Sequence, residues 1–513
     1  MIGHAALRYL RDCLCVCALA AGTALHAGER LDVGLSGSGA RIEAQVLPGA
    51  RADAPTIALI GGLSGADESV ARVRDGLARF AALGPSGRRV RLIGIALANP
   101  DGAALQFPPT GVAYRDHPES HALWRWIGLH APDLVLIEGR DEHGLAAALS
   151  SMPAAEVGTV PARAAGGPRA LEALNRIELV RSQADVELHR RLARTPVQLA
   201  EELARYYGHE FNQPLYIGAL ALIGQLRLGH VADVTQLVEP YVDGSRNSLE
   251  RPNSLVLAGH LIFTALARAQ ADPRYVQRVR AAADLGFDEQ GRMKEAMPYH
   301  QQLSDSIFMG AVILAQAGAL TGETRYFDMA ARHVAFMQHL VLRPDGLYRH
   351  QPATDAAWGR GNAFAALGLA LTLGEMPTQH AAYPGLLRSY RDLMAVLARF
   401  QDSEGLWRNV IDYPGAFPEF SATAMIGFAM LRGIERGWLP ESQYRPLVER
   451  AWQAVLARVG PEGHLVDVCE STPGQSSLAD YMHRAALLGP DPRGGAMALL
   501  FATERAGLGH GDL

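Results

Sequence analysis

The sequence predicts two domains of different class, an all-α (α/α)6 barrel preceded by a smaller α/β domain. The chain has 513 residues, too many for one small core. Short apolar runs bounded by turn residues fill the first part, whereas amphipathic helical periods dominate from Leu171 onward. A glycine-centred turn also recurs in the second part. An Ala-, Gly- and Pro-rich linker between Ser150 and Pro168 places the two domains at residues 28–165 and 166–513.

Residues 1–27 are predicted to form a secretory signal peptide. Arg8 and Arg11 flank an apolar core from Leu14 to Leu25, and the stretch ends in small residues. An uncleaved anchor is the less favoured alternative, because the apolar run is shorter than the roughly 20 residues of a membrane-spanning helix. We therefore expect a periplasmic or secreted protein whose mature chain has no integral membrane domain.

The composition bounds the partners and the ligands. A net charge of −5 argues against a nucleic-acid partner held by phosphate neutralisation. Three of the four cysteines lie in the predicted signal peptide, so the mature chain keeps only Cys469 and has no intramolecular disulfide. One thiol cannot build a Cys-rich zinc site, and neither a metal nor a cofactor is expected. The oligomeric state is not predicted by the sequence.

The first domain alternates strand and helix patterns. Its clearest strand candidates are apolar runs that end in turn chemistry. They are Thr56 to Ile60, Val90 to Leu97, and Leu134 to Ile137. Strands alternating with helical patterns are typical of an α/β sheet.

The second domain is predicted to contain helices and loops only. Its amphipathic stretches are Pro196 to Tyr207, Val256 to Ala271, Ile307 to Leu320, Tyr326 to Leu340 and Leu386 to Phe400. Turns centred on Gly291, Gly346, Gly405 and Gly463 follow each other at intervals of 55, 59 and 58 residues. Such an interval holds a helical hairpin, and about six hairpins make a closed barrel. An open solenoid is the competing arrangement.

Several polar and aromatic residues of the second domain are candidates for chemistry. The run Trp358-Gly359-Arg360-Gly361-Asn362 puts an aromatic ring, a cation and an amide on a glycine-flexed turn. Taken singly, each candidate also has a structural interpretation. Trp358 could pack in a core, Asp305 stands where a helix cap would stand, and His350 could be a hydrogen-bonded loop residue.

Taken together, the order and spacing of these residues resemble the unsaturated rhamnogalacturonyl hydrolases, glycoside hydrolase family 105, which are related to family 88. The resemblance covers about Val197 to Leu500 and is most specific in the run Asp305 to Met309 followed by Trp358 to Asn362. It implies a barrel that acts on an acidic oligosaccharide whose terminal uronate carries a C4=C5 double bond. The family match implies Asp305 and His350 as catalytic residues. It implies substrate-binding roles for Trp358, Arg360, Asn362, Phe364, His300, Asn253, Glu419 and Ser421.

In that family an Asp at the position of Asp305 is the general acid and base, which protonates C4 and directs water to C5. The resemblance further implies that Arg360 binds the uronate carboxylate with two charge-assisted hydrogen bonds and that Trp358 forms a wall for the sugar ring. Three positions depart from the family pattern: Leu303 replaces a Trp, Asn253 replaces an Asp, and Ala363-Phe364 replaces Gly-Trp. These departures motivate an alternative function, a non-catalytic protein that binds acidic carbohydrate.

The first domain resembles the zinc carboxypeptidases over about Pro55 to Ala148. The resemblance is carried by the turn Asn99-Pro100-Asp101-Gly102 and by the run Ala131-Pro132-Asp133-Leu134-Val135. The zinc ligands of that family are missing, because Ser64 to Asp67 and Glu138 to Arg140 stand where histidine and glutamate ligands belong. The resemblance therefore implies a degenerate peptidase fold, and an active metallocarboxypeptidase is the least favoured function.

Overall fold

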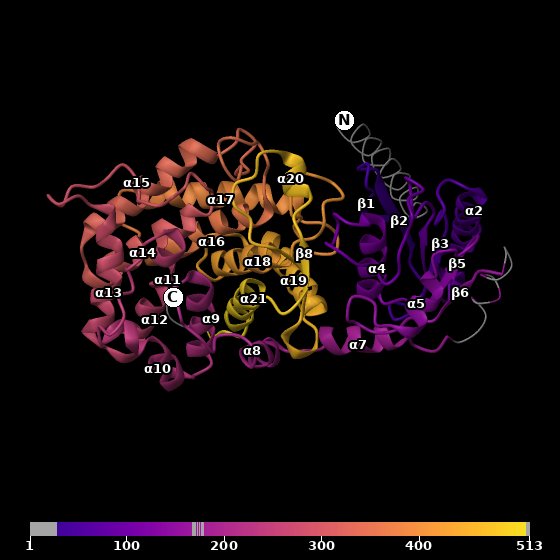
Figure 1. Ribbon diagram of the computed structural model, residues 1–513, viewed down its shortest axis with the longest axis horizontal. Helices are drawn as coiled ribbons and strands as arrows, with labels where there is room; N and C mark the ends of the chain where they lie inside the picture. The colour runs from indigo at the N-terminus through magenta and orange to yellow at the C-terminus, as the bar shows by residue number, and fades with distance from the viewer. Residues whose placement is uncertain (1–27, 167–170, 172, 174, 176–178, 509–513) are drawn as a thin grey trace, which may run out of the picture. The chain divides into compact units, whose positions relative to one another are not determined.

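A computed structural model describes residues 28–166, 171, 173, 175 and 179–508 (Figure 1). The predicted signal peptide, residues 1–27, lies outside the described residues. The chain divides into two compact units, Met1–His189 and Arg190–Leu513. The division falls inside helix α7 (Gln183–Leu192), later than the linker that the sequence predicts.

The first unit is an α/β sheet of six strands in the order β1-β2-β4-β3-β5-β6. The strands are β1 (Glu29–Leu35), β2 (Arg41–Leu47), β3 (Thr56–Ile60), β4 (Arg91–Ile95), β5 (Leu134–Ile137) and β6 (Ala162–Ala164). Strands β3 to β6 run parallel, and β1 and β2 are antiparallel to their neighbours. Every residue of β3 and β5 is buried, as expected for apolar strands covered on both faces. The bounds of β3 and β5 confirm two strand predictions, and β4 is shorter than predicted.

Helices cover both faces of this sheet (Figure 1). Ala58 and Ile60 of β3 pack in a core with α4 (Pro118–His130) and α5 (Leu145–Ser151). Ile57 and Leu59 point the other way, into a core with α2 (Glu68–Ala82). The short helix α3 (Gly84–Gly87) follows α2. The alternation along β3 therefore assigns each helix to a face.

The second unit is an all-α barrel of inner and outer helices within the described residues. The inner ring contains α9 (Tyr216–Arg227), α11 (Ser254–Gly259) with α12 (Leu261–Gln270), α14 (Ser306–Thr321), α16 (Gly359–Glu375), α18 (Phe420–Glu435) and α21 (Pro492–Arg505). The outer helices are α8 (Pro196–Ala204), α10 (Val231–Val242), α13 (Pro273–Ala283), α15 (Thr324–Val341), α17 (Tyr383–Phe400) and α19 (Glu441–Arg458). Each inner helix packs against the next, and α21 packs against α9. The ring is therefore closed, and the open solenoid is excluded.

Burial separates the inner helices from the outer ones. Helices α14 and α16 are buried over most of their length on all sides, whereas α15 and α17 bury one face only. This difference follows from sequence, since an apolar helix is stable in a core and an amphipathic one at a surface. The predicted helix from Val256 to Ala271 is interrupted at His260, where α11 ends and α12 begins. Just before the break Gly259 lies so close to Pro214 that a side chain there would overlap its carbonyl oxygen.

The four repeated turns have the same backbone geometry. Gly291, Gly346, Gly405 and Gly463 all have positive φ angles, between 72° and 92°. In each turn one backbone N–H donates to the carbonyl oxygen four residues later, at 2.8 to 3.0 Å. The donors are Asp288, Arg343, Asp402 and Gly460. The predicted repeat is confirmed, and each turn leads from an outer helix towards the start of the next inner one.

One prediction for this unit is wrong, because the described residues after Leu171 include two strands. β7 (Leu465–Cys469) and β8 (Ala486–Gly489) form an antiparallel pair with α20 (Leu478–Met482) between them. Every residue of β7 is buried, and the run Leu-Val-Asp-Val-Cys is short and rich in valine, which suits a strand. Cys469 at its end is a buried free thiol whose pKa is raised by burial.

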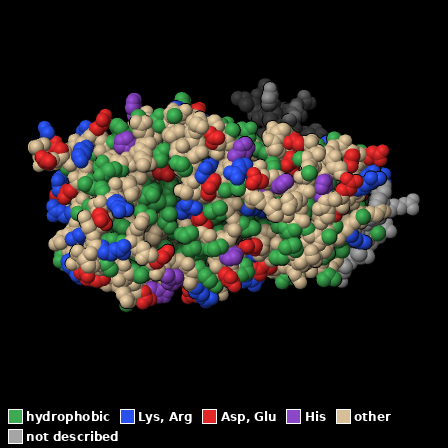
Figure 2. All heavy atoms as spheres, in the orientation of Figure 1, with side chains coloured by type: hydrophobic (Ala, Val, Ile, Leu, Met, Phe, Trp, Pro, Cys, Tyr) green, Lys and Arg blue, Asp and Glu red, His purple; other side chains and the backbone are tan. Residues whose placement is uncertain are grey.

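No helix among the described residues is both long and apolar enough to cross a membrane. Figure 2 shows acidic and basic side chains interspersed over the visible face of the molecule.

Two fully buried histidines predict that acid destabilises the barrel. Burial lowers the pKa of His260 and of His333 to about 4. Between pH 4 and the unfolded value near 6.5 the unfolded chain binds more protons, so stability is lost as the pH falls through this window. A shift of this size corresponds to at most about 3 kcal/mol for each group.

Urea unfolding at about pH 7 and about pH 5 measures this effect. We expect lower stability at the acidic pH and a weaker pH dependence in His333→Gln, but not in a His209→Gln control at an exposed site. Equal stability of the wild type at both pH values would contradict the expectation.

Candidate active site

The predicted site residues gather at the N-terminal ends of the inner helices. Asp305, Trp358, Glu419 and Asn253 immediately precede α14, α16, α18 and α11. The Tyr216 hydroxyl at the start of α9 interacts electrostatically with Arg360, Asp305, Arg493 and Asp491, which belong to the starts of α14, α16 and α21. Burial raises the pKa of this tyrosine to about 12, so it stays neutral. The inner helices therefore direct their starts to one end of the barrel.

Asp305 does not cap its helix. It occupies the N-cap position of α14, but its side chain accepts no hydrogen bond from the first turn. Its carboxylate lies instead beside His350, with 3.5 Å between Asp305 Oδ1 and His350 Nε2. The Asp305 side chain is 18% exposed, whereas that of His350 is completely buried. The interpretation of Asp305 as a helix cap is therefore excluded, and the two predicted catalytic residues lie next to each other.

Three buried polar atoms at this place lack hydrogen-bond partners among the described residues. They are Asp305 Oδ1, His350 Nε2 and Ser304 Oγ. A Cβ built on Gly361 would lie 2.5 Å from Ser304 Oγ and 3.6 Å from Asp305 Oδ1, so these two atoms lie over the same glycine. Buried polar groups are rarely left unpaired in folded proteins except where a ligand completes them. The cluster is therefore the strongest candidate for a binding site for reacting groups.

His350 is held by two aromatic rings and a hydroxyl group. The rings of Trp358 and Tyr481 lie 4.4 and 5.5 Å from the imidazole, centre to centre. His350 Nδ1 lies 2.8 Å from the Tyr481 hydroxyl. Asn409 joins both rings, since its side chain accepts from Trp358 Nε1 at 3.2 Å and donates to the Tyr481 carbonyl at 2.7 Å.

This packing corrects the role predicted for Trp358. Its side chain is 1% exposed, so it cannot form a wall that a sugar ring contacts. One part of the indole packs on His350, and the Arg360 guanidinium lies 4.5 Å over its ring. Trp358 fixes the imidazole and the guanidinium in place instead.

The structure also corrects the role predicted for Arg360. Its guanidinium donates to the carbonyl oxygens of Cys469 and Glu470, both at 2.6 Å, and lies 3.7 Å from Glu419. The residue is 2% exposed. These bonds tie the start of α16 to the end of β7, so two of the guanidinium N–H groups are taken up by backbone carbonyls.

Glu419 and Ser421 belong to the same buried network, which corrects their predicted contact with substrate. The Glu419 carboxylate accepts from the backbone N–H groups of Ser421, Ala422 and Cys469 and from the Ser421 hydroxyl. Both residues are completely buried. Glu419 is thus an N-cap for α18 whose charge is balanced by Arg360.

Asn362 and Phe364 are likewise core residues, contrary to the prediction. The Asn362 amide exchanges hydrogen bonds with the Tyr348 backbone at 2.8 Å in both directions. Phe364 is 1% exposed and stacks on Phe308 with 5.5 Å between ring centres. Neither side chain has an atom left for a substrate. They point to different sides of α16, and both are buried because this inner helix is packed all round.

His300 and Asn253 lie near the barrel rim and are partly exposed. His300 Nδ1 accepts from the Gln302 N–H at 3.0 Å, and partial burial lowers the pKa of its imidazole. Asn253 caps α11 by accepting from the Val256 N–H at 3.0 Å. Of the predicted binding residues, only His300 and Asn253 are partly exposed, and each side chain already accepts a backbone hydrogen bond.

Three residues of the site were not predicted. Ser304 precedes Asp305 and carries no motif signal of its own, while Asn409 and Tyr481 come from segments far along the chain. The Ser304 N–H donates to the His350 carbonyl oxygen at 2.9 Å, and this bond joins the loop before α14 to the loop that carries His350. No periodicity marks these residues, because tertiary pairing alone brings them to His350.

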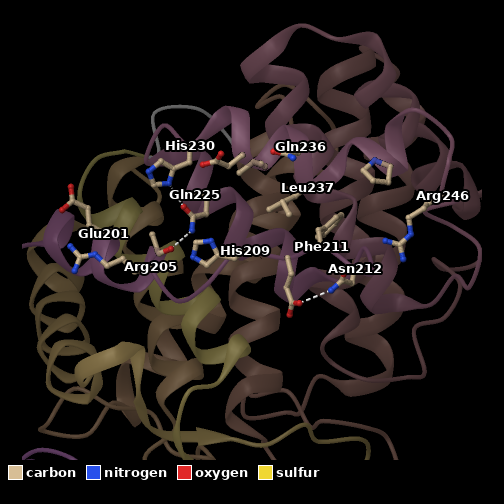
Figure 3. A pocket seen from close by; sticks show the side chains of 16 residues that line it. Glu201, Arg205, His209, Phe211, Asn212, Gln225, His230, Gln236, Leu237 and Arg246 are labelled. Atoms are coloured by element: carbon tan, nitrogen blue, oxygen red, sulfur yellow. Dashed lines mark hydrogen bonds between the residues drawn. The ribbon is translucent and has the colours of Figure 1, made fainter.

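Two cavities of the second unit lie on the outer side of α9. One, of about 930 Å³, lies between α8, α9 and α10 and is lined by His209, Gln225, His230 and Arg246 among others (Figure 3). The second, of about 530 Å³, shares the stretch from Gly208 to Asn212 with it. Neither contains Asp305 or His350. We assign the candidate site to the Asp305 cluster, because unpartnered titratable groups converge there.

Gly361→Ala is expected to lower kcat without changing the fold. The added methyl group would come within 2.5 Å of Ser304 Oγ and so displace the Ser304 hydroxyl beside Asp305, whereas its 3.6 Å separation from Asp305 Oδ1 is ordinary contact. A displacement of this kind costs about 10- to 100-fold in rate. Gly385→Ala in α17 is the control, because nothing lies within 4 Å of its added Cβ. Steady-state kinetics with thermal unfolding test this, and an unchanged kcat in Gly361→Ala would contradict a role for the Ser304 hydroxyl beside Asp305.

The described residues contain no group of three or more His, Cys, Asp or Glu side chains that could hold a metal ion.

Residues 231–508, more than half of the chain, match the sequence model of Glycosyl Hydrolase Family 88. The unsaturated rhamnogalacturonyl hydrolase YesR of Bacillus subtilis is 25% identical over 266 residues, which are 48% of this chain and 75% of that protein. An unsaturated 3S-rhamnoglycuronyl hydrolase of Formosa agariphila is 31% identical over 100 residues, 19% of this chain and 26% of that protein.

Two solved structures share the fold of the second unit. A possible member of glycoside hydrolase family 105 from Salmonella enterica has a TM-score of 0.50 at 20% identity, covering 62% of this chain and 93% of that one. A family 88 glycosyl hydrolase from Bacteroides vulgatus has a TM-score of 0.51 at 18% identity, covering 61% and 100%.

Proposed function

The chain belongs to glycosyl hydrolase family 88, and we propose that it removes unsaturated uronyl residues from acidic oligosaccharides by hydrating their C4=C5 double bond. Relatives named as unsaturated rhamnogalacturonyl and 3S-rhamnoglycuronyl hydrolases support action on unsaturated uronyl sugars. The observation that carries the proposal is the pairing of Asp305 with His350, in which both facing atoms lack partners.

Asp305 is the proposed general acid and base. Its carboxyl group gives a proton to C4 of the unsaturated ring and takes one from the water that adds to C5. The hydrated product is a hemiketal, which rearranges and releases the aglycone sugar. One carboxyl group suffices, because the group that gives its proton to C4 can then take one from the water, whereas ordinary glycosidases divide their roles between two carboxylates.

His350 and Ser304 are the proposed partners of Asp305. The imidazole Nε2 faces the carboxylate at 3.5 Å and is placed to contact the water or the sugar beside it. The Ser304 hydroxyl offers one further donor and acceptor at the same glycine. These groups come from two loops that a backbone bond joins, which fixes their geometry before substrate arrives.

The starts of the inner helices supply positive potential for the uronate carboxylate. Each helix start carries about half a unit of positive charge on its free N–H groups, which favours an anion nearby. Arg360 is buried behind the helix starts. Arg493, near the start of α21, is partly exposed, and its buried Nε has no partner among the described residues. We propose Arg493, rather than Arg360, as the side chain that meets the carboxylate.

Two further proposals rest on sequence. The chain is exported to the periplasm or beyond through the predicted signal peptide, which N-terminal sequencing of the mature protein tests. The first unit is a degenerate relative of the zinc carboxypeptidases, supported by its strands β3 and β5 and the turn at Asn99. Stoichiometric zinc in the purified protein would contradict the degenerate assignment.

Loss of the ultraviolet absorbance of the conjugated uronate tests the proposed function. The protein is incubated with lyase-generated pectic, ulvan, alginate and glycosaminoglycan fragments, and we expect the absorbance to fall with at least one class. Constant absorbance with every class contradicts hydration. Calorimetric binding without turnover would instead identify the alternative, a non-catalytic acidic-carbohydrate-binding protein.

A further inference from the structure

We infer that Tyr481 is a positioning residue that holds His350 in one neutral tautomer, with its proton on Nε2 facing Asp305. This inference deepens the proposed function and rests on it. Tyr481 lies in α20, more than one hundred residues beyond His350, and both side chains are completely buried. Its hydroxyl oxygen lies 2.8 Å from His350 Nδ1.

The other hydrogen bonds of the Tyr481 hydroxyl group indicate which partner donates in its bond to His350 Nδ1. The Tyr481 oxygen already accepts from the Gln475 N–H at 3.1 Å. Its own proton needs an acceptor, and His350 Nδ1 lies at 2.8 Å; the Thr354 side chain also interacts with this phenol, but its hydroxyl can donate as well as accept. Burial raises the pKa of this phenol, so the proton stays on the oxygen. Tyr481 therefore donates, and Nδ1 is the unprotonated nitrogen.

The opposite nitrogen then carries the proton. In a neutral imidazole one nitrogen donates and the other accepts, and the bond made by one nitrogen decides the state of the other. With Nδ1 accepting from Tyr481, the proton lies on Nε2, which is 3.5 Å from Asp305 Oδ1 and makes no direct hydrogen bond to it in this structure. The reverse tautomer would set an Nε2 lone pair against Asp305 Oδ1 once the carboxyl group has given its proton to C4. It would also turn the tyrosine proton away from the imidazole and towards the Thr354 side chain.

The surrounding contacts keep this arrangement rigid. Asn409 holds the Tyr481 backbone carbonyl at 2.7 Å and the Trp358 indole N–H at 3.2 Å, so the two rings that confine the imidazole share one anchor. The Gly359 N–H also donates to the Asn409 carbonyl at 2.7 Å. The segment between β7 and β8 thus contacts His350 through the ring and hydroxyl group of Tyr481, whose backbone Asn409 holds.

Catalysis gains a fixed neutral donor beside Asp305. An Nε2–H aimed at the carboxylate stabilises it after it has given its proton to C4, and it orients the attacking water. His350 is then neither the proton source nor the base. A site that lost the tyrosine hydroxyl would let the imidazole adopt both tautomers, and one of them would face Asp305 with a lone pair.

Nitrogen NMR of histidine-labelled full-length protein tests the inference, with His350→Gln used to assign its signals. We expect the wild-type His350 spectrum to show a protonated Nε2 and an unprotonated Nδ1. Wild-type protein with the proton on Nδ1 would overturn the inference without any variant. This readout needs no substrate, so its failure is distinguishable from failure of the proposed hydrolase activity.

Tyr481→Phe supplies the second readout, with Tyr390→Phe as the matched control. Tyr390 is also completely buried, and its hydroxyl donates to the Ala429 carbonyl at 2.6 Å, in the packing between α17 and α18. We expect Tyr481→Phe to mix the His350 tautomers and to lower kcat by about 10-fold or more with little change in KM. Tyr390→Phe should change neither. An unchanged tautomer, or equal kcat in both variants, would overturn the inference.

Discussion

Asp305→Asn is expected to lower kcat on an unsaturated uronyl oligosaccharide by about 1000-fold, since it removes the group that both gives and takes a proton. The fold should persist, because this side chain caps no helix and its Oδ1 has no hydrogen-bond partner among the described residues. Asparagine nearly matches its shape. Steady-state kinetics and thermal unfolding of the same preparation measure both effects.

The control for this variant is Asp233→Asn, an exposed aspartate on α10 that should leave kcat unchanged. An Asp305→Asn enzyme with more than about a tenth of wild-type kcat would show that another group transfers the proton. Asp305→Asn protein with normal activity but reduced stability would restore the capping interpretation that the sequence left open.

Arg360→Met is expected to destabilise the barrel by about 3–5 kcal/mol, because it leaves the buried Glu419 carboxylate without its compensating charge. It also removes the bonds to the Cys469 and Glu470 carbonyls. Urea unfolding measures the loss. The exposed Arg246 supplies the control, since Arg246→Met should change stability by less than about 0.5 kcal/mol.

A double substitution separates the charge effect from packing. Adding Glu419→Gln to Arg360→Met removes the isolated charge and should recover part of the lost stability, a coupling that a double-mutant cycle reports. A large rise in KM with unchanged unfolding would mean that Arg360 binds the uronate carboxylate, as the sequence predicts.

Much of the fold is predictable because periodicity and turn chemistry act locally. The buried strands β3 and β5 appear as uninterrupted apolar runs between turns, and the glycine of each repeated turn marks a positive φ angle. The strands of the second unit escaped prediction. Leu465 to Cys469 is five residues long, and a short apolar run does not distinguish a strand from a buried helix turn.

The sequence predicted that Asp305 and His350 lie together, but not the residues that support them. Asp305 and His350 are separated by one helical hairpin and lie together, as the family pattern implies. Trp358 and Arg360 belong to the same motif, yet both are buried, since a motif specifies residue types and not the direction of side chains. Tyr481 and Asn409 depend on the pairing of distant loops, which no local pattern encodes.

Proton NMR of the reaction in heavy water tests the central claim most directly. If Asp305 protonates C4 and water adds to C5, the uronyl product carries deuterium at C4, and its double bond is lost as the aglycone appears. Asp305→Asn should give neither change. Release of the aglycone with the double bond intact and no deuterium at C4 would contradict hydration and identify direct cleavage of the glycosidic bond.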